Sequence, residues 1–243
     1  MARTRTEEDW HIMDSFVRKL SNTIEFAKKS GWRTFLREVS YRVDNALCDW
    51  RLGVDTEGMV GLAELGISNP DLVDYVPLGY RAIWSTLRSI PLERAQSTFL
   101  DYGCGKGRAV VAAATLPYRR VIGVEISAEL LGAAKRNVAL MRSKRAQSVD
   151  LTHADAAKYR VPDDVNVIYF FNPFKGQVLQ AVVGEILNSS RRAPRPIYII
   201  YFNKKHFDQE IAASERIRKV SEMHVYPNYS CGIYQVVNVA PSG

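Results

Sequence analysis

The second half of the chain alternates short apolar runs with amphipathic stretches. Runs of strand length occupy residues 98–101, 121–125, 149–152, 165–171 and 197–202. Helical patterns lie between them at residues 108–115, 128–141 and 176–187. This alternation predicts an α/β fold, in which a parallel sheet is covered by helices on both faces. The runs at 165–171 and 197–202 are apolar on both faces, which is typical of central strands.

The C-terminal residues carry a different pattern. Two further strands are predicted at residues 224–226 and 233–239, with a turn at residues 229–232 between them. A connection this short cannot cross over to make a parallel pair, so we expect an antiparallel hairpin. The complete prediction is a doubly wound, mostly parallel seven-strand sheet that ends in an antiparallel C-terminal hairpin.

The first sixty residues predict an N-terminal helical extension. Apolar residues recur every three or four positions over 10–27 and again over 32–50, and Gly31 separates the two stripes. A helical hairpin over residues 1–60 follows, and we expect its stripe to pack on its own domain. A second copy and a membrane surface are alternatives. Residues 61–97 form a linker and a helix ahead of the first motif, and residues 98–243 form the sheet domain.

Composition and charge narrow the function classes. The apolar runs are far shorter than the ~18 residues that a membrane span needs, and the first residues do not resemble a signal peptide. Cys48, Cys104 and Cys231 are widely separated and the four histidines are scattered, so we expect no metal site and a reducing cytoplasm. The net charge of +7 comes from small basic groups after residue 97. Aromatic residues do not alternate with these basic groups, as they do on protein surfaces that stack on the bases of a nucleic acid.

A glycine-rich loop follows the first predicted strand of the sheet domain. Residues 99–108 read Phe-Leu-Asp-Tyr-Gly-Cys-Gly-Lys-Gly-Arg. Glycines let a backbone turn tightly and approach a ligand, and the next helix offers free amides. A phosphate-binding P-loop is excluded because Lys106 is followed by Gly107 instead of serine or threonine. A dinucleotide fingerprint is disfavoured because Arg108 stands where it needs glycine or alanine.

The remaining pattern runs from Asp101 through Gly103, Gly105 and Gly107, with Glu125 at the end of the next strand. Here the chain resembles the class I S-adenosylmethionine-dependent methyltransferases, including small bacterial members and seven-strand protein-lysine methyltransferases. The resemblance extends over about residues 75–202. It implies S-adenosylmethionine as the cofactor, with the glycines and Asp101 under its methionine end and Glu125 on the ribose. A carboxylate suits a diol because it accepts two charge-assisted hydrogen bonds.

Two more segments match the family in the same order. Asp155 and Ala156 follow the third predicted strand, where the family places an acid beside the adenine amino group. Asn172, Pro173 and Phe174 end the fourth strand and resemble the [DNS]-P-P-[YFW] motif of amino-methylating enzymes, with one proline instead of two. The resemblance implies that these three residues position the methyl acceptor at the carboxyl edge of the sheet.

The expected activity is N-methylation of a protein lysine or another amine. The Asn172 side-chain oxygen can aim an amine lone pair without adding charge, and Phe174, Tyr75 and Tyr80 are candidate walls for a cationic acceptor. One alternative is a methyltransferase for exocyclic amino groups of nucleic acids, which the missing second proline and the lack of a target-recognition domain disfavour. Another alternative is a non-catalytic scaffold that binds the cofactor. The presence of both acids, Asp101 and Glu125, disfavours such a degenerate site.

Overall fold

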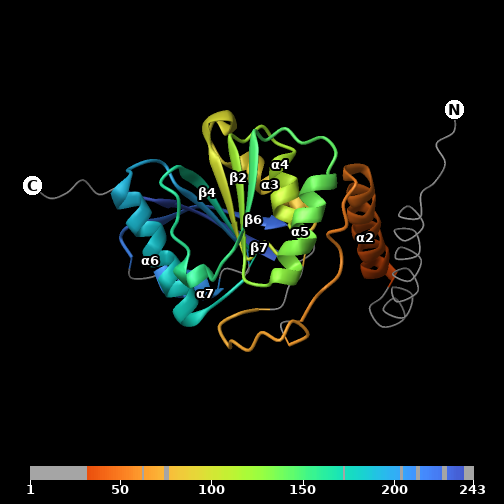
Figure 1. Ribbon diagram of the computed structural model, residues 1–243, viewed down its shortest axis with the longest axis horizontal. Coiled ribbons are helices and arrows are strands. Elements are labelled where there is room, and N and C mark those ends of the chain that lie inside the picture. Colours follow the sequence, from red (N-terminus) through yellow and green to blue (C-terminus); the bar gives the residue numbers. More distant parts are fainter. Residues whose placement is uncertain are drawn as a thin grey trace, which may run out of the picture.

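The computed structural model describes residues 32–61, 63–73, 77–171, 173–202, 205–211, 214–225 and 229–237. Within these residues, one seven-stranded sheet forms the centre of the molecule (Figure 1). Its strands are β1 (Thr98–Tyr102), β2 (Arg120–Glu125), β3 (Ser148–His153), β4 (Val165–Phe171), β5 (Tyr198–Phe202), β6 (Ile217–Val225) and β7 (Tyr229–Val236).

The strand order is β3-β2-β1-β4-β5-β7-β6. Strands β1 to β5 are parallel, and β7 pairs antiparallel with both β5 and β6. The predicted doubly wound sheet with an antiparallel C-terminal hairpin is confirmed. The chain winds outward from β1 in one direction and from β4 in the other. Ligands of open α/β sheets bind at such a switch point, outside the carboxyl ends of the strands.

Helices cover both faces of the sheet. In chain order they are α2 (Trp32–Leu52), α3 (Tyr80–Ser89), the short η1 (Arg94–Gln96), α4 (Arg108–Ala114), α5 (Ala128–Leu140), η2 (Ala156–Lys158), α6 (Gly176–Arg192) and α7 (Lys205–Ile211). One apolar core joins α3 and α4 to one face, and a second joins α6 and α7 to the other. Figure 1 shows these two helical layers, with α2 outside α5.

The C-terminal hairpin differs from its prediction. Strand β6 begins at Ile217, well before the predicted start at 224, and β7 begins at Tyr229. The turn predicted at residues 229–232 is therefore wrong, because these residues pair within the sheet. Strand β6 is an edge strand, and residues 218–222 are all exposed. Such a strand carries no alternation of apolar and polar residues, so the sequence pattern missed it. The seven-residue α7 was not predicted either.

Helix α2 confirms the second predicted N-terminal helix, whereas residues 10–27 lie outside the described residues. Part of its apolar stripe is exposed and does not pack on the sheet domain as expected, whereas Phe35, Val39 and Val43 of the same stripe are half-buried. Four of its large apolar side chains are exposed: Trp32 (70%), Leu36 (47%), Leu47 (50%) and Trp50 (56%). The opposite face is buried through polar contacts. None of the helices in the described ranges is long and apolar enough to cross a membrane.

Candidate active site

The glycine loop connects β1 to α4 at the carboxyl ends of the parallel strands. Gly103, Gly105 and Gly107 have φ angles of 72°, 55° and 86°, in the left-handed region that side-chain-bearing residues rarely adopt. The backbone N–H groups of Gly103 and Cys104 donate to the Val124 carbonyl at 2.9 and 3.0 Å. These bonds fix the loop to the end of β2.

Gly103 also lies directly against the loop that follows β4. A Cβ atom at this position would lie 2.8 Å from Cβ of Pro173, which is closer than non-bonded carbon atoms approach. Only glycine allows this contact. The segments that follow β1 and β4 therefore meet at the switch point of the sheet.

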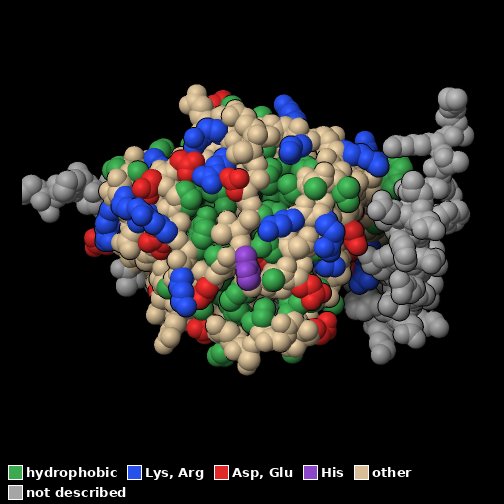
Figure 2. All heavy atoms as spheres, viewed as in Figure 1, with side chains coloured by type: hydrophobic (Ala, Val, Ile, Leu, Met, Phe, Trp, Pro, Cys, Tyr) green, Lys and Arg blue, Asp and Glu red, His purple; other side chains and the backbone are tan. Residues whose placement is uncertain are grey.

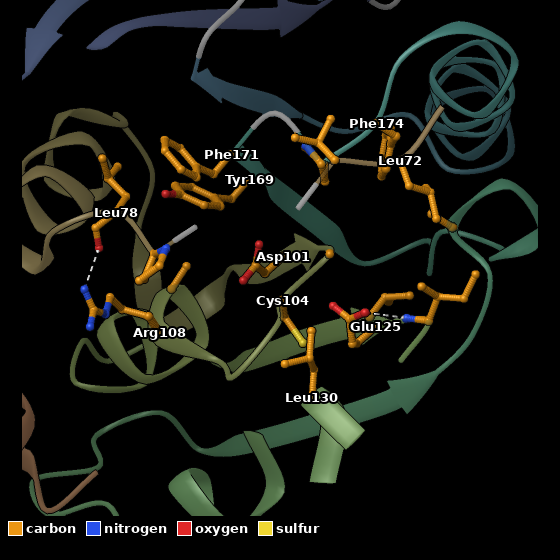
Figure 3. A pocket seen from close by; sticks show the side chains of 18 of the residues that line it. Leu72, Leu78, Asp101, Cys104, Arg108, Glu125, Leu130, Tyr169, Phe171 and Phe174 are labelled. Atoms are coloured by element: carbon orange, nitrogen blue, oxygen red, sulfur yellow. Dashed lines mark hydrogen bonds between the residues drawn. The ribbon is translucent and has the colours of Figure 1, made fainter. Parts of the chain in front are cut away.

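A cavity opens beside this contact (Figure 3). On the side of β1 and β2 it is lined by Asp101, Gly103 and Glu125. The other predicted residues that line it are Asp155, Ala156, Pro173 and Phe174. Gly105 and Gly107 shape the loop without lining the cavity, and Asn172 and Tyr75 lie outside the described residues. The structure thus brings seven of the predicted site residues to one place.

Asp101 is a buried carboxylate in the middle of this cavity wall (Figure 3). Its side chain is 3% exposed, and no described residue donates a hydrogen bond to it. Burial, and then the negative charge of Glu125, raise the pKa of Asp101 well above its ordinary value. A buried charge without a partner is unfavourable. The position therefore favours a ligand that brings a positive charge or a hydrogen-bond donor.

Glu125 lies at the end of β2 and braces the glycine loop. Its Oε2 accepts the backbone N–H of Gly105 at 2.8 Å, and its Oε1 accepts those of Ile126 and Ser127, both at 2.9 Å. A carboxylate offers about four acceptor positions, so these three amides leave one without a donor among the described residues. The Ser127 hydroxyl in turn accepts the Leu130 N–H and caps α5.

Asp155 and Ala156 follow β3 at the adjacent edge of the cavity. The Asp155 carboxylate accepts the Ala157 N–H at 3.0 Å and so caps the short helix η2. It also lies 3.8 Å from the Lys158 ammonium. Asp155 is partly exposed, so its remaining acceptor positions face the cavity and solvent.

The loop after β4 is held by an earlier segment of the chain. The Val73 N–H donates to the Pro173 carbonyl at 3.1 Å, and Leu72 forms a β-bridge with Phe174. The Asp71 carbonyl accepts the Lys175 N–H at 2.7 Å. The Phe174 ring is 2% exposed and packs edge-on against Tyr102 and Phe170. Ring packing therefore holds Phe174 in place at the cavity wall, and a backbone hydrogen bond holds Pro173.

Arg108, Tyr169 and Phe171 are among the residues that line the cavity but were not predicted as site residues. Tyr169 and Phe171 lie four and two positions before Pro173, so the two-residue period of a strand places them on one face. Arg108 directly follows the glycine loop, and its sequence position indicates only that the loop is not a dinucleotide fingerprint. Tyr80 was predicted as a wall, but it does not line the cavity.

Comparison with known proteins agrees with this geometry. Residues 99–195, from the first residues of β1 to just beyond α6, match the family model of a methyltransferase domain. Residues 99–195 therefore form a methyltransferase domain within the seven-strand sheet. The glycine loop and strands β2 to β4 lie within the matched residues, whereas strands β5 to β7 follow them. Part of the cavity lining, at residues 72–83, precedes the matched residues.

Solved methyltransferases share the fold at low sequence identity. An RNA methyltransferase from Salinibacter ruber, in complex with S-adenosyl-L-homocysteine, is 15% identical with a TM-score of 0.52 over 69% of this chain and 98% of that one. A SAM-dependent methyltransferase from Aquifex aeolicus is 14% identical with a TM-score of 0.50 over 64% and 89%. The ribosomal protein L11 methyltransferase of Thiobacillus denitrificans is 49% identical over 47 residues. That match covers 19% of this chain and 16% of that protein.

The cavity of the methyltransferase domain fits S-adenosylmethionine. This molecule carries two positive groups, an ammonium and a sulfonium. The Asp101 carboxylate, which accepts no hydrogen bond from the described residues, is available to them. Glu125 retains an acceptor position for a ribose hydroxyl, and Asp155 can accept from an adenine amino group. In the described part of the chain, no cluster of three metal-ligating side chains occurs.

Proposed function

We propose that this protein transfers the methyl group of S-adenosylmethionine to an amine nitrogen of a protein, a lysine side chain being the favoured acceptor. The observation that supports this most is the two-sided cavity at the switch point. The carboxylates of Asp101 and Glu125 lie on one side, and the aromatic side chains of Tyr169 and Phe171 lie on the other (Figure 3). One side suits a cationic nucleoside, and the other suits an acceptor that must lose water.

In this proposal the charged side holds the cofactor. Asp101 receives its ammonium end, the glycine loop supports its methionine moiety, Glu125 binds the ribose, and Asp155 with Ala156 flanks the adenine. When bound, S-adenosylmethionine supplies a methyl group already activated by positively charged sulfur. The protein then has to align the acceptor nitrogen and exclude water, and such alignment can account for much of the rate.

The apolar side prepares the acceptor. A lysine must lose its proton before its lone pair can react, and desolvation lowers an ammonium pKa in that direction. We expect the Asn172 side-chain oxygen to accept an acceptor N–H and so to direct the lone pair. The Pro173 carbonyl already accepts the Val73 N–H, but a carbonyl oxygen has two lone pairs. One of them remains for the acceptor.

A protein acceptor is favoured over a nucleic acid by two observations. The relative with 49% identity over 47 residues is named for ribosomal protein L11, which supports a protein as the substrate class. Lysine, arginine and acidic side chains are interspersed on the face shown in Figure 2, and they do not form a single basic groove there. The second candidate is an exocyclic amino group of a nucleic acid, which the Asn172-Pro173-Phe174 motif and the net charge of +7 support.

We also propose that this reaction takes place in the cytoplasm. Cys48, Cys104 and Cys231 are free thiols. Free thiols are characteristic of proteins that work in a reducing compartment.

Transfer of a labelled methyl group from S-adenosylmethionine into a cell extract tests the proposal. The label should enter the protein fraction, and Asn172→Ala should slow transfer while leaving cofactor affinity unchanged. Label in RNA or DNA would instead support the second candidate. Binding of S-adenosylhomocysteine without any transfer would leave a cofactor-binding scaffold, and a normal rate in Asn172→Ala would refute the role of that side chain.

A further inference from the structure

A buried ionic cluster lies directly beneath the glycine loop. Its centre is Arg108, the first residue of α4, whose side chain is 3% exposed. The guanidinium donates to Oε1 of Glu57 at 2.6 Å and to Oγ1 of Thr56 at 2.7 Å, and it lies 3.5 Å from Oδ2 of Asp49. It also stacks over the ring of Tyr80, 5.1 Å from the centroid.

Asp49 connects this cluster to helix α2. The residue is 5% exposed and belongs to the buried face of α2, opposite the exposed tryptophans. Its carboxylate accepts the Tyr80 hydroxyl at 2.7 Å, the Thr56 hydroxyl at 2.8 Å and the Thr56 N–H at 3.1 Å. Residues from α2, from the segment after it and from α3 thus surround one arginine.

The same segment also holds the glycine loop at a second point. The Lys106 ammonium donates to the Glu57 carbonyl at 2.7 Å. The Asn137 amide of α5 donates to the carbonyls of Lys106 and Asp55, both at 2.9 Å. The residues on either side of Gly107 are therefore both tied to residues 55–57. Those residues lie outside the part of the chain that matches the methyltransferase domain.

From this arrangement we infer that residues 49–57 are part of the cofactor site, with Asp49 as a positioning residue that acts through Arg108. Three glycines at positive φ make the loop costly to order, and a ligand binds more tightly when its loop is ordered beforehand. Buried charges resist displacement as long as their partners remain. The cluster therefore holds the loop in its binding conformation. The inference rests on the proposed function only in that the loop holds the cofactor.

Calorimetry with S-adenosylhomocysteine on the full chain tests the inference. We expect Asp49→Asn to raise the dissociation constant about tenfold, which corresponds to ~1.4 kcal/mol. Asp44→Asn is the matched control, because Asp44 lies on the same helix and pairs with Arg81 at the surface. The control should bind as the wild type does. If Asp49→Asn lowers the melting temperature but binds with unchanged affinity while folded, the cluster is only structural and the inference is wrong.

Thr56 offers a second pair of variants. Thr56→Val keeps the shape but removes the hydroxyl that joins Asp49 to Arg108, whereas Thr56→Ser keeps that hydroxyl. Weakened binding in Thr56→Val with recovery in Thr56→Ser supports the inference, and equal affinities contradict it.

Amide hydrogen exchange of the wild type gives a reading that does not depend on any variant. Addition of S-adenosylhomocysteine should slow exchange over residues 54–57 as well as over the glycine loop. Protection of the loop alone would overturn the inference. If the wild type binds no S-adenosylhomocysteine, the proposed function fails and this inference fails with it, whereas normal binding by the wild type with no effect of the variants overturns the inference alone.

Discussion

At Asp101, folding and binding make opposite demands on a single carboxyl group. The pKa of Asp101 is raised by burial and by Glu125, so the folded chain keeps this proton to a higher pH than the unfolded chain. Between the ordinary value of 3.8 and the raised value, the folded state binds more protons, and its stability falls as the pH rises. A ligand cation reverses this preference because it requires the ionised form.

Asp101→Asn should therefore stabilise the ligand-free protein and weaken its binding. At pH 7.5 we expect the melting temperature to rise by about 2–4 °C, the shift that ~1 kcal/mol gives a domain of this size. The affinity of the wild type for S-adenosylhomocysteine should fall as the pH is lowered through the raised pKa of Asp101, while that of the variant changes much less. A variant that melts earlier and binds normally would contradict this account.

Gly103 and Gly66 allow conformational strain to be separated from steric contact. Their φ angles are similar, 72° and 67°, but a Cβ at Gly103 meets Pro173 whereas one at Gly66 meets nothing within 4 Å. Gly66→Ala should cost only the ~1–2 kcal/mol of a left-handed alanine. Gly103→Ala should cost clearly more in urea denaturation and should also abolish cofactor binding. Equal losses of stability would show that Pro173 moves aside freely.

Among the elements, the buried ones follow the sequence pattern and the exposed ones do not. The strand at residues 165–171 was predicted with both of its ends, because runs that are apolar on both faces mark central strands. Strand β6 was largely missed because an exposed edge strand has no buried face to mark it. Helix α2 was predicted, but its orientation was not. The pattern shows which face is apolar, whereas the domain holds the polar face through Asp49 and Asn45.

Two leucines near the end of α2 test this orientation. Leu47 is 50% exposed, and Leu52 is 8% exposed. Leu52→Ala should lower the free energy of unfolding by about 2–5 kcal/mol, as for other buried leucines. Leu47→Ala should change it by less than ~0.5 kcal/mol. Denaturant unfolding of both variants gives the comparison, and a reversed order would mean that the apolar stripe packs on the domain.

At the scale of the whole molecule, the site combines a contiguous motif with distant supports. Asp101, Gly103 and Glu125 could be predicted because the loop chemistry lies within a few residues of two strand ends. The contact of Arg108 with Thr56 could not, because it joins residues 52 positions apart in the sequence. A single long-range contact of this kind produces no periodic pattern in the amino-acid sequence. The tether from Val73 to Pro173 was unpredictable for the same reason.

The distribution of charge over the molecule predicts how substrate binding responds to salt. With basic and acidic side chains interspersed (Figure 2), a lysine peptide should bind with nearly the same KM at 50 and 200 mM salt. A nucleic acid held by six to ten phosphate contacts would lose about 10³–10⁵ in affinity over that range. Steady-state kinetics at both concentrations distinguish the two substrate classes.

The cluster around Arg108 also limits how far the chain can be shortened. A fragment that starts at residue 75 keeps every motif residue, yet it leaves a buried guanidinium without Asp49 and Glu57. Removing the partner of a buried charge typically costs about 3–5 kcal/mol, a large part of the ~5–15 kcal/mol that keeps a domain folded. We expect such a fragment to accumulate as insoluble material. A truncation that begins at Trp32 should still yield a protein that can be purified.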